Sequence, residues 1–478
     1  MPKKILAMLL PWCCLLTGVV SAQAQAQAPE PAVVYPAQLM TEMAALRDGA
    51  FRSDYAYRQV AHLSENIGPR MGGSPQAEQA AEYVAAEMRK LGLDAHLEEV
   101  RLPRWVRGAE TAELVQFPGQ APQTIQKIVV TTLSGSTSTP TAGLTAEVIA
   151  VNNFEELKQL GRAKVAGKIV LFNFSFDKQK AAAGSAGEAY GEAVAYRVAA
   201  GKSAADLGAA ASLVRSVGGA DYRLPHTGYS LPAGIPQGAV AAEDADLISH
   251  LAAQGPVQLH LTLTPQVLPE VIGHNVIADL KGSEHPEQIV VVSGHLDSWD
   301  LGTGALDDAA GVAVAMEVAH LVQQLHLHPK RTIRVIAWMD EENGGRGHDA
   351  YEKAHGADFP NYVAAMESDL GSGHCLGYIV KASAKAIALL QPVQAVMQSA
   401  GANVLRPTNS SPGSDISPMV RAGIPGLAPL QDARTYFNYH HTAADTLDKI
   451  VPRELQENAA AMAVMAYALA DMPETLPR

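Results

Sequence analysis

Histidine and carboxylate side chains recur at short spacing in the second half of the chain, and together they could bind a catalytic metal ion. The runs are His295-Leu-Asp297, Asp307-Asp308, Glu341-Glu342, Asp369 and His440-His441. When cysteine is absent, zinc binds imidazole and carboxylate, and a catalytic zinc keeps one position open for water. The runs therefore predict a zinc site that serves hydrolysis.

The number of these side chains suits two zinc ions that share one bridging carboxylate. His295, Asp307 and Asp369 would serve one ion, and Asp307, Glu342 and His441 would serve the other. Three carboxylates and one bridging hydroxide would balance the charge of two divalent ions. We therefore expect two Zn²⁺ ions per chain.

Two further acids have expected roles beside these ligands. Asp297 lies two residues after His295, so its side chain is expected to accept the second ring N–H and fix the tautomer. Glu341 is expected to be the general acid/base, which takes a proton from a metal-activated water and later protonates the leaving amine. An isolated acidic pair is more often a helix cap, so this prediction depends on all the clusters together.

The clusters follow short apolar segments that have the pattern of buried strands. Residues 288–294 precede His295, residues 332–338 precede the acidic pair, and residues 361–366 precede Asp369. Nearly continuous apolar runs are typical of strands buried on both faces. Open α/β sheets bind ligands at the carboxyl ends of their strands. We expect an α/β fold with a mostly parallel central sheet flanked by helices.

The pattern of the chain changes twice. Residues 37–119 are mainly helical and residues 269–478 alternate strand and helix, whereas residues 120–268 contain short β-rich segments, loops and Ala-rich helices. We expect a catalytic domain in two parts, 37–119 and 269–478, with a smaller β-rich domain, 120–268, inserted between them.

The N-terminus has the pattern of an export signal. Lys3-Lys4, an apolar run over residues 5–20 and Ser21-Ala22 predict a signal peptide over 1–22, followed by a Gln/Ala-rich flexible leader over 23–36. An uncleaved anchor is less favoured because the run is shorter than the ~20 residues of a membrane span. We expect a periplasmic or extracellular protein. Cleavage would remove Cys13 and Cys14 and leave Cys375 as the only cysteine, so no internal disulfide is expected.

Charge and hydropathy exclude some function classes. The 478 residues contain 36 Lys plus Arg against 49 Asp plus Glu, a net charge of -13, which disfavours nucleic-acid binding. No long apolar stretch follows the first 22 residues, so no stable membrane insertion is expected after signal cleavage.

Several runs resemble the carboxypeptidase Q family, also called plasma glutamate carboxypeptidase. It belongs to the co-catalytic dinuclear zinc peptidases of the zinc aminopeptidase and glutamate carboxypeptidase clan. The similar runs are GHLDSWD at 294–300, MESD at 366–369, YFNYHH at 436–441, PHTG at 225–228 and ADM at 470–472. The resemblance extends from about residue 45 to the end of the sequence.

The resemblance implies the same ligands: His295, Asp307, Glu342, Asp369 and His441, with Asp307 bridging and Glu341 as acid/base. It also implies a cis peptide between Asp307 and Asp308, a protease-associated-type inserted domain, and a homodimer that hydrolyses short peptides, above all dipeptides. One departure is Asp340, since relatives often have a small residue before the glutamate pair.

The residues that recognise substrate are less clearly marked. Asp415 is a candidate for binding an ammonium group, Arg346, His348 or Arg434 for a carboxylate, and His440 for the oxyanion of the transition state. The same residue types are common at helix caps and on surfaces.

Other functions remain open at this stage. Aminopeptidases and carboxypeptidases that act on longer peptides use the same metals. A glutaminyl-cyclase-like zinc acyltransferase would hold one zinc, and the full set of five ligands argues against it. A catalytically inactive binding protein would have lost ligands, and none of the five is missing here.

Overall fold

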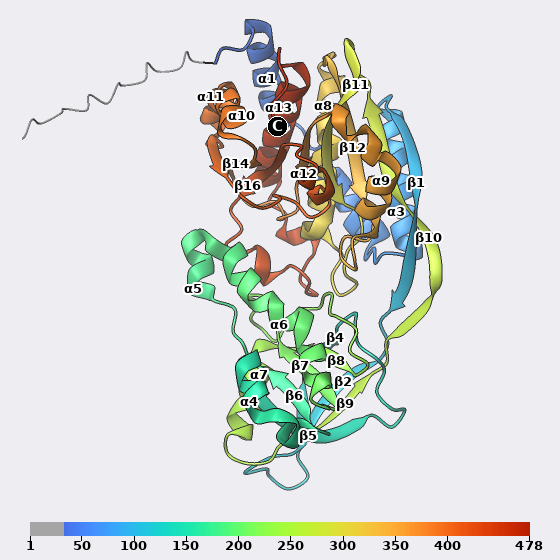
Figure 1. Ribbon diagram of the computed structural model, residues 1–478, viewed down its shortest axis with the longest axis vertical. Helices are drawn as coiled ribbons and strands as arrows, with labels where there is room; N and C mark the ends of the chain where they lie inside the picture. The colour runs from blue at the N-terminus through green and yellow to red at the C-terminus, as the bar shows by residue number, and fades with distance from the viewer. Residues whose placement is uncertain (1–32) are drawn as a thin grey trace, which may run out of the picture.

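The computed structural model describes residues 33–478 and has two lobes, each built around an eight-stranded sheet (Figure 1). The first lobe combines the N-terminal segment with the second half of the chain, and the second lobe comes from the residues between them. The predicted signal peptide, 1–22, and the leader up to residue 32 lie outside the described residues.

The first sheet has its parallel strands in the centre, as the sequence predicts. Its order is β1-β10-β12-β11-β13-β16-β14-β15. Strands β12, β11, β13 and β16 are parallel. Strand β1 pairs antiparallel with β10, β10 with β12, and β14 with β16, whereas β14 and β15 are parallel to each other, so the sheet as a whole is mixed. The strands are β1 (Asp94–Val106), β10 (Gln266–Leu280), β11 (His285–His295), β12 (Arg331–Trp338), β13 (Tyr362–Glu367), β14 (Cys375–Lys381), β15 (Val404–Pro407) and β16 (Gly426–Gln431).

Helices cover both faces of this sheet. One face is covered by α1 (Ala37–Ala50), α2 (Tyr55–Ala61), α3 (Pro75–Lys90), α8 (Ala310–Gln324), α10 (Ala384–Leu389), α11 (Gln391–Met397) and α13 (Pro452–Asp471). The opposite face carries α9 (Arg346–His355) and α12 (Ser417–Arg421). Helices α8 and α13 are apolar and buried on nearly every side, which is typical of helices inside a core.

Strand β11 shows how the apolar pattern places the first histidine. Val290 and Val292 pack into the core beneath α8 and α13, while Ile289 and Val291 pack against the opposite face. This alternation is the two-residue period of a strand buried on both sides. The strand ends at His295, where the apolar run stops.

The second lobe combines short strands with helices, and the sequence predicts both in this segment. Its sheet has the order β3-β2-β9-β5-β6-β7-β8-β4, with β5 to β8 parallel. The strands are β2 (Glu110–Gln116), β3 (Gln126–Ile128), β4 (Val130–Thr132), β5 (Leu144–Val151), β6 (Ile169–Phe172), β7 (Ala211–Arg215), β8 (Gln237–Val240) and β9 (Gln258–Leu263). The helices are α4 (Phe154–Val165), α5 (Lys178–Lys180), α6 (Ala186–Asp206) and α7 (Ala242–Ala252).

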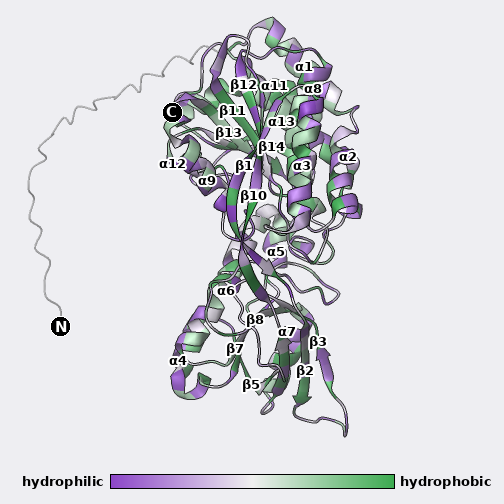
Figure 2. Cartoon of the chain, turned by 90° about the vertical axis from the view of Figure 1, so that its right-hand side faces the viewer, coloured by the Kyte–Doolittle hydropathy of each residue, from purple (hydrophilic) through white to green (hydrophobic). Residues whose placement is uncertain are grey.

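Two short connections join the lobes at a narrow waist (Figure 2). One links β1 to β2 and contains Arg107, and the other links β9 to β10. Arg107 contacts both lobes, because its guanidinium donates to Asp300 at 2.6 Å and to Thr227 Oγ1 at 3.1 Å. Over residues 33–478, the helices all fall short of the length and apolarity that crossing a bilayer requires.

Candidate metal centre

Three neighbouring parallel strands deliver the predicted site residues to one edge of the first sheet. His295 is the last residue of β11, Glu341 and Glu342 follow β12, and Asp369 follows β13. Because β12, β11 and β13 are adjacent and parallel, the loops after them meet at the same edge. The convergence expected from the sequence is present in the structure.

Asp307 lies between two histidines. Its Oδ1 is 3.1 Å from His295 Nε2, and its Oδ2 is 3.2 Å from His441 Nε2. Asp369 Oδ1 lies 3.3 Å from His295 Nε2, and Glu342 Oε2 lies 2.8 Å from His441 Nε2. Asp307 therefore occupies the place of a carboxylate shared by two sets of ligands, with one histidine and one acid on each side.

Backbone carbonyls accept the other ring nitrogen of both histidines. His295 Nδ1 is 2.9 Å from the backbone oxygen of Asp297, whereas the Asp297 carboxylate is 3.9 Å away. The expected carboxylate acceptor is thus replaced by the carbonyl of the same residue. His441 Nδ1 is 3.2 Å from the carbonyl of Thr227, which belongs to the second lobe. A ring that donates from Nδ1 leaves its Nε2 lone pair free to face the acids.

The Asp297 carboxylate holds the loop that carries the acidic pair. Its Oδ1 accepts the backbone N–H groups of Asp340 at 2.8 Å and Glu341 at 3.2 Å. This contact connects the end of β11 to the turn after β12. Asp297 therefore acts on Glu341 and Glu342 through their backbone.

Asp307 is positioned by two other acids. Asp445 accepts the backbone N–H of Leu306 at 2.7 Å and that of Asp307 at 3.2 Å. Asp308 accepts the N–H of His295 at 3.0 Å and caps the following helix at Gly311, with a bond of 2.9 Å. The peptide between Asp307 and Asp308 is cis, as the resemblance implies. The sequence contains Asp445 beside the histidine pair but does not reveal this role.

Two features missed by sequence reasoning hold the loops around Asp307 together. The buried guanidinium of Arg70 donates to the carbonyls of Leu296 at 2.9 Å and Gly304 at 2.7 Å. Helix α8 also approaches the end of β13 so closely that a Cβ at Gly311 would lie 1.9 Å from the Ser368 carbonyl oxygen. Only a glycine at that position permits this packing.

The electrostatics of the cluster suit divalent cations. Burial raises the pKa of Glu342 to about 8 and that of Asp369 to about 6. Burial also acts to raise the pKa of Asp307, but His440, His295 and His441 outweigh it and hold that pKa well below its usual range. Glu342 Oε1 and Asp307 Oδ2 are buried without a hydrogen-bond partner in the described part of the chain. Buried carboxylates that lack partners are what bound cations would satisfy.

Three sets of side chains have ligand atoms close enough to hold a metal ion. Two of them share His295, one with Asp307 and Glu342 and the other with Asp308 and Asp369. Because both Asp308 oxygens already accept backbone N–H groups, Asp308 acts as a cap in this structure. The two sets that share His295 contain four of the five predicted ligands, and the fifth, His441, belongs to the third set.

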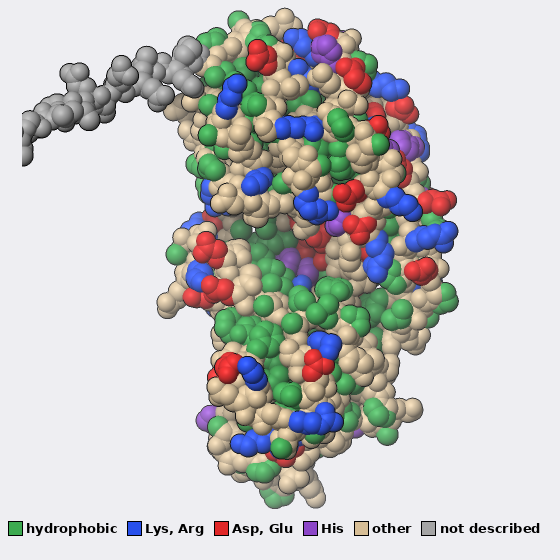
Figure 3. Space-filling view, in the orientation of Figure 1, with side chains coloured by type: hydrophobic (Ala, Val, Ile, Leu, Met, Phe, Trp, Pro, Cys, Tyr) green, Lys and Arg blue, Asp and Glu red, His purple; other side chains and the backbone are tan. Residues whose placement is uncertain are grey.

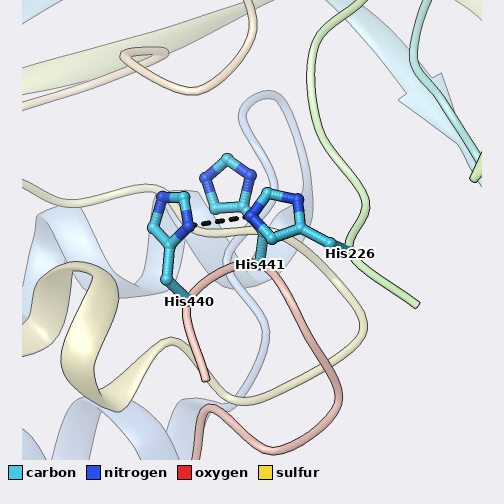
Figure 4. Close-up of side chains that lie close together, drawn as sticks. All are labelled: His226, His440 and His441. Atoms are coloured by element: carbon cyan, nitrogen blue, oxygen red, sulfur yellow. Dashed lines mark hydrogen bonds between the residues drawn. The ribbon is translucent and has the colours of Figure 1, made fainter. Parts of the chain in front are cut away.

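The third set consists of His226, His440 and His441 (Figure 4). His226 Nε2 is 3.0 Å from His440 Nδ1, and the rings of His440 and His441 stack with 3.7 Å between centroids. Burial lowers the pKa of His226 and His440 well below the usual range, so both are neutral. His226 comes from the second lobe and supports the loop that carries His441.

The structure places the predicted substrate residues in different surroundings. His440 borders the cavity above the acids. Asp415 is fully buried and lies 2.9 Å from His348 Nδ1, and Arg346 donates to Asp340 at 2.8 Å. Neither Asp415 nor Arg346 lines that cavity. The pair with Arg346 also balances the additional charge of Asp340, and Asp340 Oδ1 is buried without a hydrogen-bond partner in the described part of the chain.

A cavity of about 490 Å³ opens above the acids between the two lobes (Figure 3). The first lobe lines it with His295, Asp307, Glu341, Glu342, Asp369 and the histidine pair, among others. The second lobe lines it with Gly187, Tyr190, Val194, Arg197 and Tyr229. No residue of this second group was expected from the sequence, because none belongs to a motif with a known chemistry.

Comparisons with known proteins agree with this geometry. The sequence profile of Peptidase family M28 matches residues 275–466. Carboxypeptidase Q of Bos taurus is 36% identical over 430 residues, which cover 88% of this chain and 87% of that relative. The solved structure of a Peptidase M28 precursor from Shewanella amazonensis has a TM-score of 0.86 at 32% identity and covers 92% of this chain and 98% of its own.

A zinc aminopeptidase of Bacillus subtilis shares the fold, with a TM-score of 0.63, 22% identity, and coverage of 89% of this chain and 99% of its own. The family expected from the sequence is confirmed. Identity of 36% over 88% of the chain shows that this protein belongs to peptidase family M28 and is a hydrolase of the metallopeptidase class.

Proposed function

We propose that this protein is an exported dinuclear zinc exopeptidase that hydrolyses short peptides, with free dipeptides as the main substrates. The observation that carries the proposal is the place of Asp307, whose two oxygens face His295 and His441 at the floor of the cavity between the lobes. Such a shared carboxylate is what a pair of metal ions requires.

The five proposed ligands are His295, Asp307, Glu342, Asp369 and His441. Their donor atoms are imidazole nitrogens and carboxylate oxygens, which zinc accepts in catalytic sites. When bound, zinc supplies Lewis acidity and lowers the pKa of water so that hydroxide forms near neutral pH.

The chain itself supplies proton transfer and orientation. Glu341 borders the cavity, and its backbone N–H is held by the Asp297 carboxylate at 3.2 Å. In the proposed reaction its carboxylate accepts a proton from the attacking water and returns it to the departing amine nitrogen. His440 borders the same cavity, and its Nε2 lies 3.5 Å from Asp307 Oδ2. We assign it a hydrogen bond to the oxyanion of the transition state, for which the ring must take up a second proton on Nε2 because its Nδ1–H faces His226 Nε2.

The size and walls of the cavity support short substrates. A volume of about 490 Å³ lies in the range of small-molecule sites. Helix α6 and Tyr229 of the second lobe lie across from the acids and limit the space for a long chain. We assign the second lobe, which contains most of the segment 120–268 together with β2, to a protease-associated-type domain that forms this wall. Export and a homodimer are part of the proposal and are supported by the signal pattern and the family resemblance, respectively.

Metal stoichiometry and a peptide panel test the proposal. The metal-stripped chain is titrated with Zn²⁺, bound zinc is counted by mass spectrometry, and free, N-blocked and C-blocked dipeptides are offered to the zinc-loaded protein. We expect two zinc ions per chain and cleavage of free dipeptides that a chelator abolishes. One tightly bound zinc together with cyclisation of an N-terminal glutamine would replace the peptidase with an acyltransferase. Two bound zinc ions without hydrolysis of any peptide would contradict the proposed reaction.

A further inference from the structure

Trp299 lies against the metal centre and donates its indole N–H to a proposed ligand. The side chain is buried, and its Nε1 lies 2.6 Å from Glu342 Oε2. An indole N–H can only donate, so the contact requires Oε2 to be an acceptor. Glu342 Oε1 is buried without a hydrogen-bond partner in the described part of the chain. The bond therefore limits the rotamers of this carboxylate and leaves its other oxygen for a cation.

The residue after Trp299 connects this contact to the waist. Asp300 accepts two N–H bonds from Arg107, at 2.6 Å and 2.9 Å, and Arg107 also donates to Thr227 Oγ1 of the second lobe at 3.1 Å. The Trp299 ring meets Trp105 with 6.1 Å between ring centroids, and Arg107 lies over the Trp105 ring. Groups at the junction of the two lobes thus hold both the backbone and the ring of Trp299.

Thr227 meets a second ligand of the same metal position. Its backbone oxygen lies 3.2 Å from His441 Nδ1, while its hydroxyl accepts the bond from Arg107. His441 Nε2 in turn lies 2.8 Å from Glu342 Oε2. Glu342 and His441 are therefore both linked to the waist, one through Trp299 and the other through Thr227.

The other proposed metal position is held from within the first lobe. His295 Nδ1 faces the carbonyl of Asp297 at 2.9 Å, and its backbone N–H donates to Asp308 at 3.0 Å. Asp369 Oδ1 lies 3.3 Å from His295 Nε2. All of these partners belong to the first lobe. The two positions share Asp307 but differ in what orients their remaining ligands.

We propose that Trp299 is a positioning residue for Glu342 and makes the metal position that Glu342 shares with His441 depend on the arrangement of the two lobes. This inference rests on the proposed function, because it takes both side chains as metal ligands. A glutamate already held in one rotamer loses less conformational freedom when it binds a metal. Changing a hydrogen-bond partner of a metal ligand typically lowers metal affinity by about 10- to 100-fold.

Two matched tryptophan variants test the role of the indole N–H. Trp299→Phe removes the donor to Glu342 and keeps an aromatic ring. Trp105→Phe removes an indole from the same apolar cluster, but the Trp105 Nε1 is buried without a hydrogen-bond partner in the described residues, so no ligand loses a contact. Competition with a chelator measures the zinc affinities of both metal-stripped variants, and urea titration checks that both are folded.

The inference predicts that only one of the two zinc ions is affected. In Trp299→Phe, we expect one zinc ion to bind about 10- to 100-fold more weakly and the other to bind as in the wild type. Trp105→Phe should keep both wild-type affinities. Equal affinities in Trp299→Phe and the wild type would overturn the positioning role, and so would an equal loss in the two variants.

Asp300→Ala tests the connection to the waist and leaves every aromatic ring in place. Arg107 keeps its pair with Glu110 at 2.7 Å, so its buried charge still has a partner. We expect one zinc ion to bind more weakly, by a smaller factor than in Trp299→Phe, because the indole N–H is still present. Wild-type affinity for both zinc ions in Asp300→Ala would overturn the dependence on the lobes.

NMR of the indole N–H groups gives a readout that a merely structural tryptophan would not change. The Trp299 signal is the one missing from the spectrum of Trp299→Phe, and the Trp105 signal is the one missing from that of Trp105→Phe. During a zinc titration of the wild type, the Trp299 signal should shift, since its acceptor then shares its charge with a cation. The Trp105 signal should shift less. A Trp299 signal that stays in place throughout the titration would overturn the inference.

Failure of the proposed function has a different signature. A wild type that binds two zinc ions and hydrolyses no peptide would contradict the proposed reaction, and a weaker zinc in Trp299→Phe would still support the positioning role. Hydrolysis of dipeptides by the wild type together with unchanged zinc affinities in Trp299→Phe would leave the proposed function standing and overturn the positioning role.

Discussion

The two lobes contribute opposite kinds of groups to the cavity between them. The first lobe supplies all the lining acids, which include Glu341, Glu342 and Asp369. The second lobe supplies a cation, Arg197, and two tyrosines, Tyr190 and Tyr229, but no acid. The first lobe thus concentrates negative charge for metal ions and proton transfer. The second concentrates neutral donors and one positive charge, which suit the recognition of a substrate anion.

The comparison also shows that the second lobe helps to build the metal centre. His441 belongs to the first lobe, yet its Nδ1 faces the Thr227 carbonyl of the second lobe at 3.2 Å. His226 reaches from the second lobe to His440 at 3.0 Å. The arrangement of the two lobes therefore influences the orientation of a proposed ligand, and the two functions are not fully separable.

The largest effect is expected from Glu341, the proposed acid/base of the first lobe. Glu341→Gln should lower kcat by about 10²- to 10⁴-fold, because proton transfer is lost while the cavity keeps its shape. Bound zinc, counted by mass spectrometry, should stay unchanged, and the exposed Glu284→Gln should behave as the wild type. A variant that keeps zinc and full kcat would remove Glu341 from the reaction.

The next effect concerns the waist between the lobes. Arg107→Met removes a mostly buried cation that pairs with Asp300 at 2.6 Å and Glu110 at 2.7 Å. Both carboxylates then lack a positively charged partner. We expect the unfolding free energy to fall by about 3 kcal/mol. We also expect a higher KM, because the lobes lose a shared contact.

Urea titration monitored by tryptophan fluorescence measures the loss of unfolding free energy. The ring centroids of Trp105 and Trp299 lie 6.1 Å apart, and Arg107 lies over the Trp105 ring, so the signal reports on the waist. Arg215→Met is the matched control. Its partner Asp246 is exposed and lies in the same lobe, so we expect a loss below about 1 kcal/mol. Equal losses of unfolding free energy in the two variants would show that the contact at the waist stabilises the protein no more than the ion pair of Arg215.

A smaller effect is expected on folding stability as a function of pH, and it comes from the first lobe, which carries the acids. In the metal-free chain, burial raises the pKa of Glu342 to about 8. Burial acts to lower the pKa of His441, but Glu342 and Asp307 outweigh it and raise that pKa to about 9. Between pH 7 and 9 the folded state thus holds protons that the unfolded state has already released, so folding stability must fall as pH rises.

The expected slope is on the order of 1 kcal/mol per pH unit. Thermal unfolding of the chelator-treated chain should show a lower midpoint at pH 9 than at pH 7. Because zinc binds the deprotonated ligands, saturating zinc should reduce or reverse this trend. A midpoint of the metal-free chain that rises over this range would contradict the assigned pKa shifts.

The smallest effect is expected at Cys375 in the core of the first lobe. Burial raises the pKa of its thiol to about 12, so the nucleophilic thiolate is scarce and shielded near pH 8. A thiol reagent should leave the native chain from residue 23 unmodified and should modify the chain in urea. Rapid reaction of the native protein would indicate that the first lobe opens locally at β14.

Sequence reasoning predicted the parts whose signals are local. Residues 288–294 and 332–338 are nearly continuous apolar runs, and the polar clusters follow them directly, so both the strands and the edge that carries the site were predicted correctly. The antiparallel strands β1, β10 and β14 were not predicted to flank the parallel centre, because strand direction depends on long connections that leave no local pattern.

Arg197 marks the limit of that reasoning. It is a single arginine in an Ala-rich helix, more than one hundred residues before Glu341, and nothing beside it in the sequence indicates a site. The Thr227 carbonyl leaves no trace at all, because every residue type carries a backbone oxygen. Arg346 and Asp415 lie near the site clusters in sequence, yet their partners, Asp340 and His348, hold them away from the cavity.

The sequence by itself determined the chemistry of this protein: the residue types, their order after buried strands, and the family. These features are local, since a strand end and the polar residue that follows it are covalently linked. Only the tertiary structure decided that Asp307 lies between two histidines, that Asp445 and Arg70 hold its loop, and that a second lobe closes the cavity with Arg197. Those contacts join segments far apart in the chain, and packing of the two lobes brings them together.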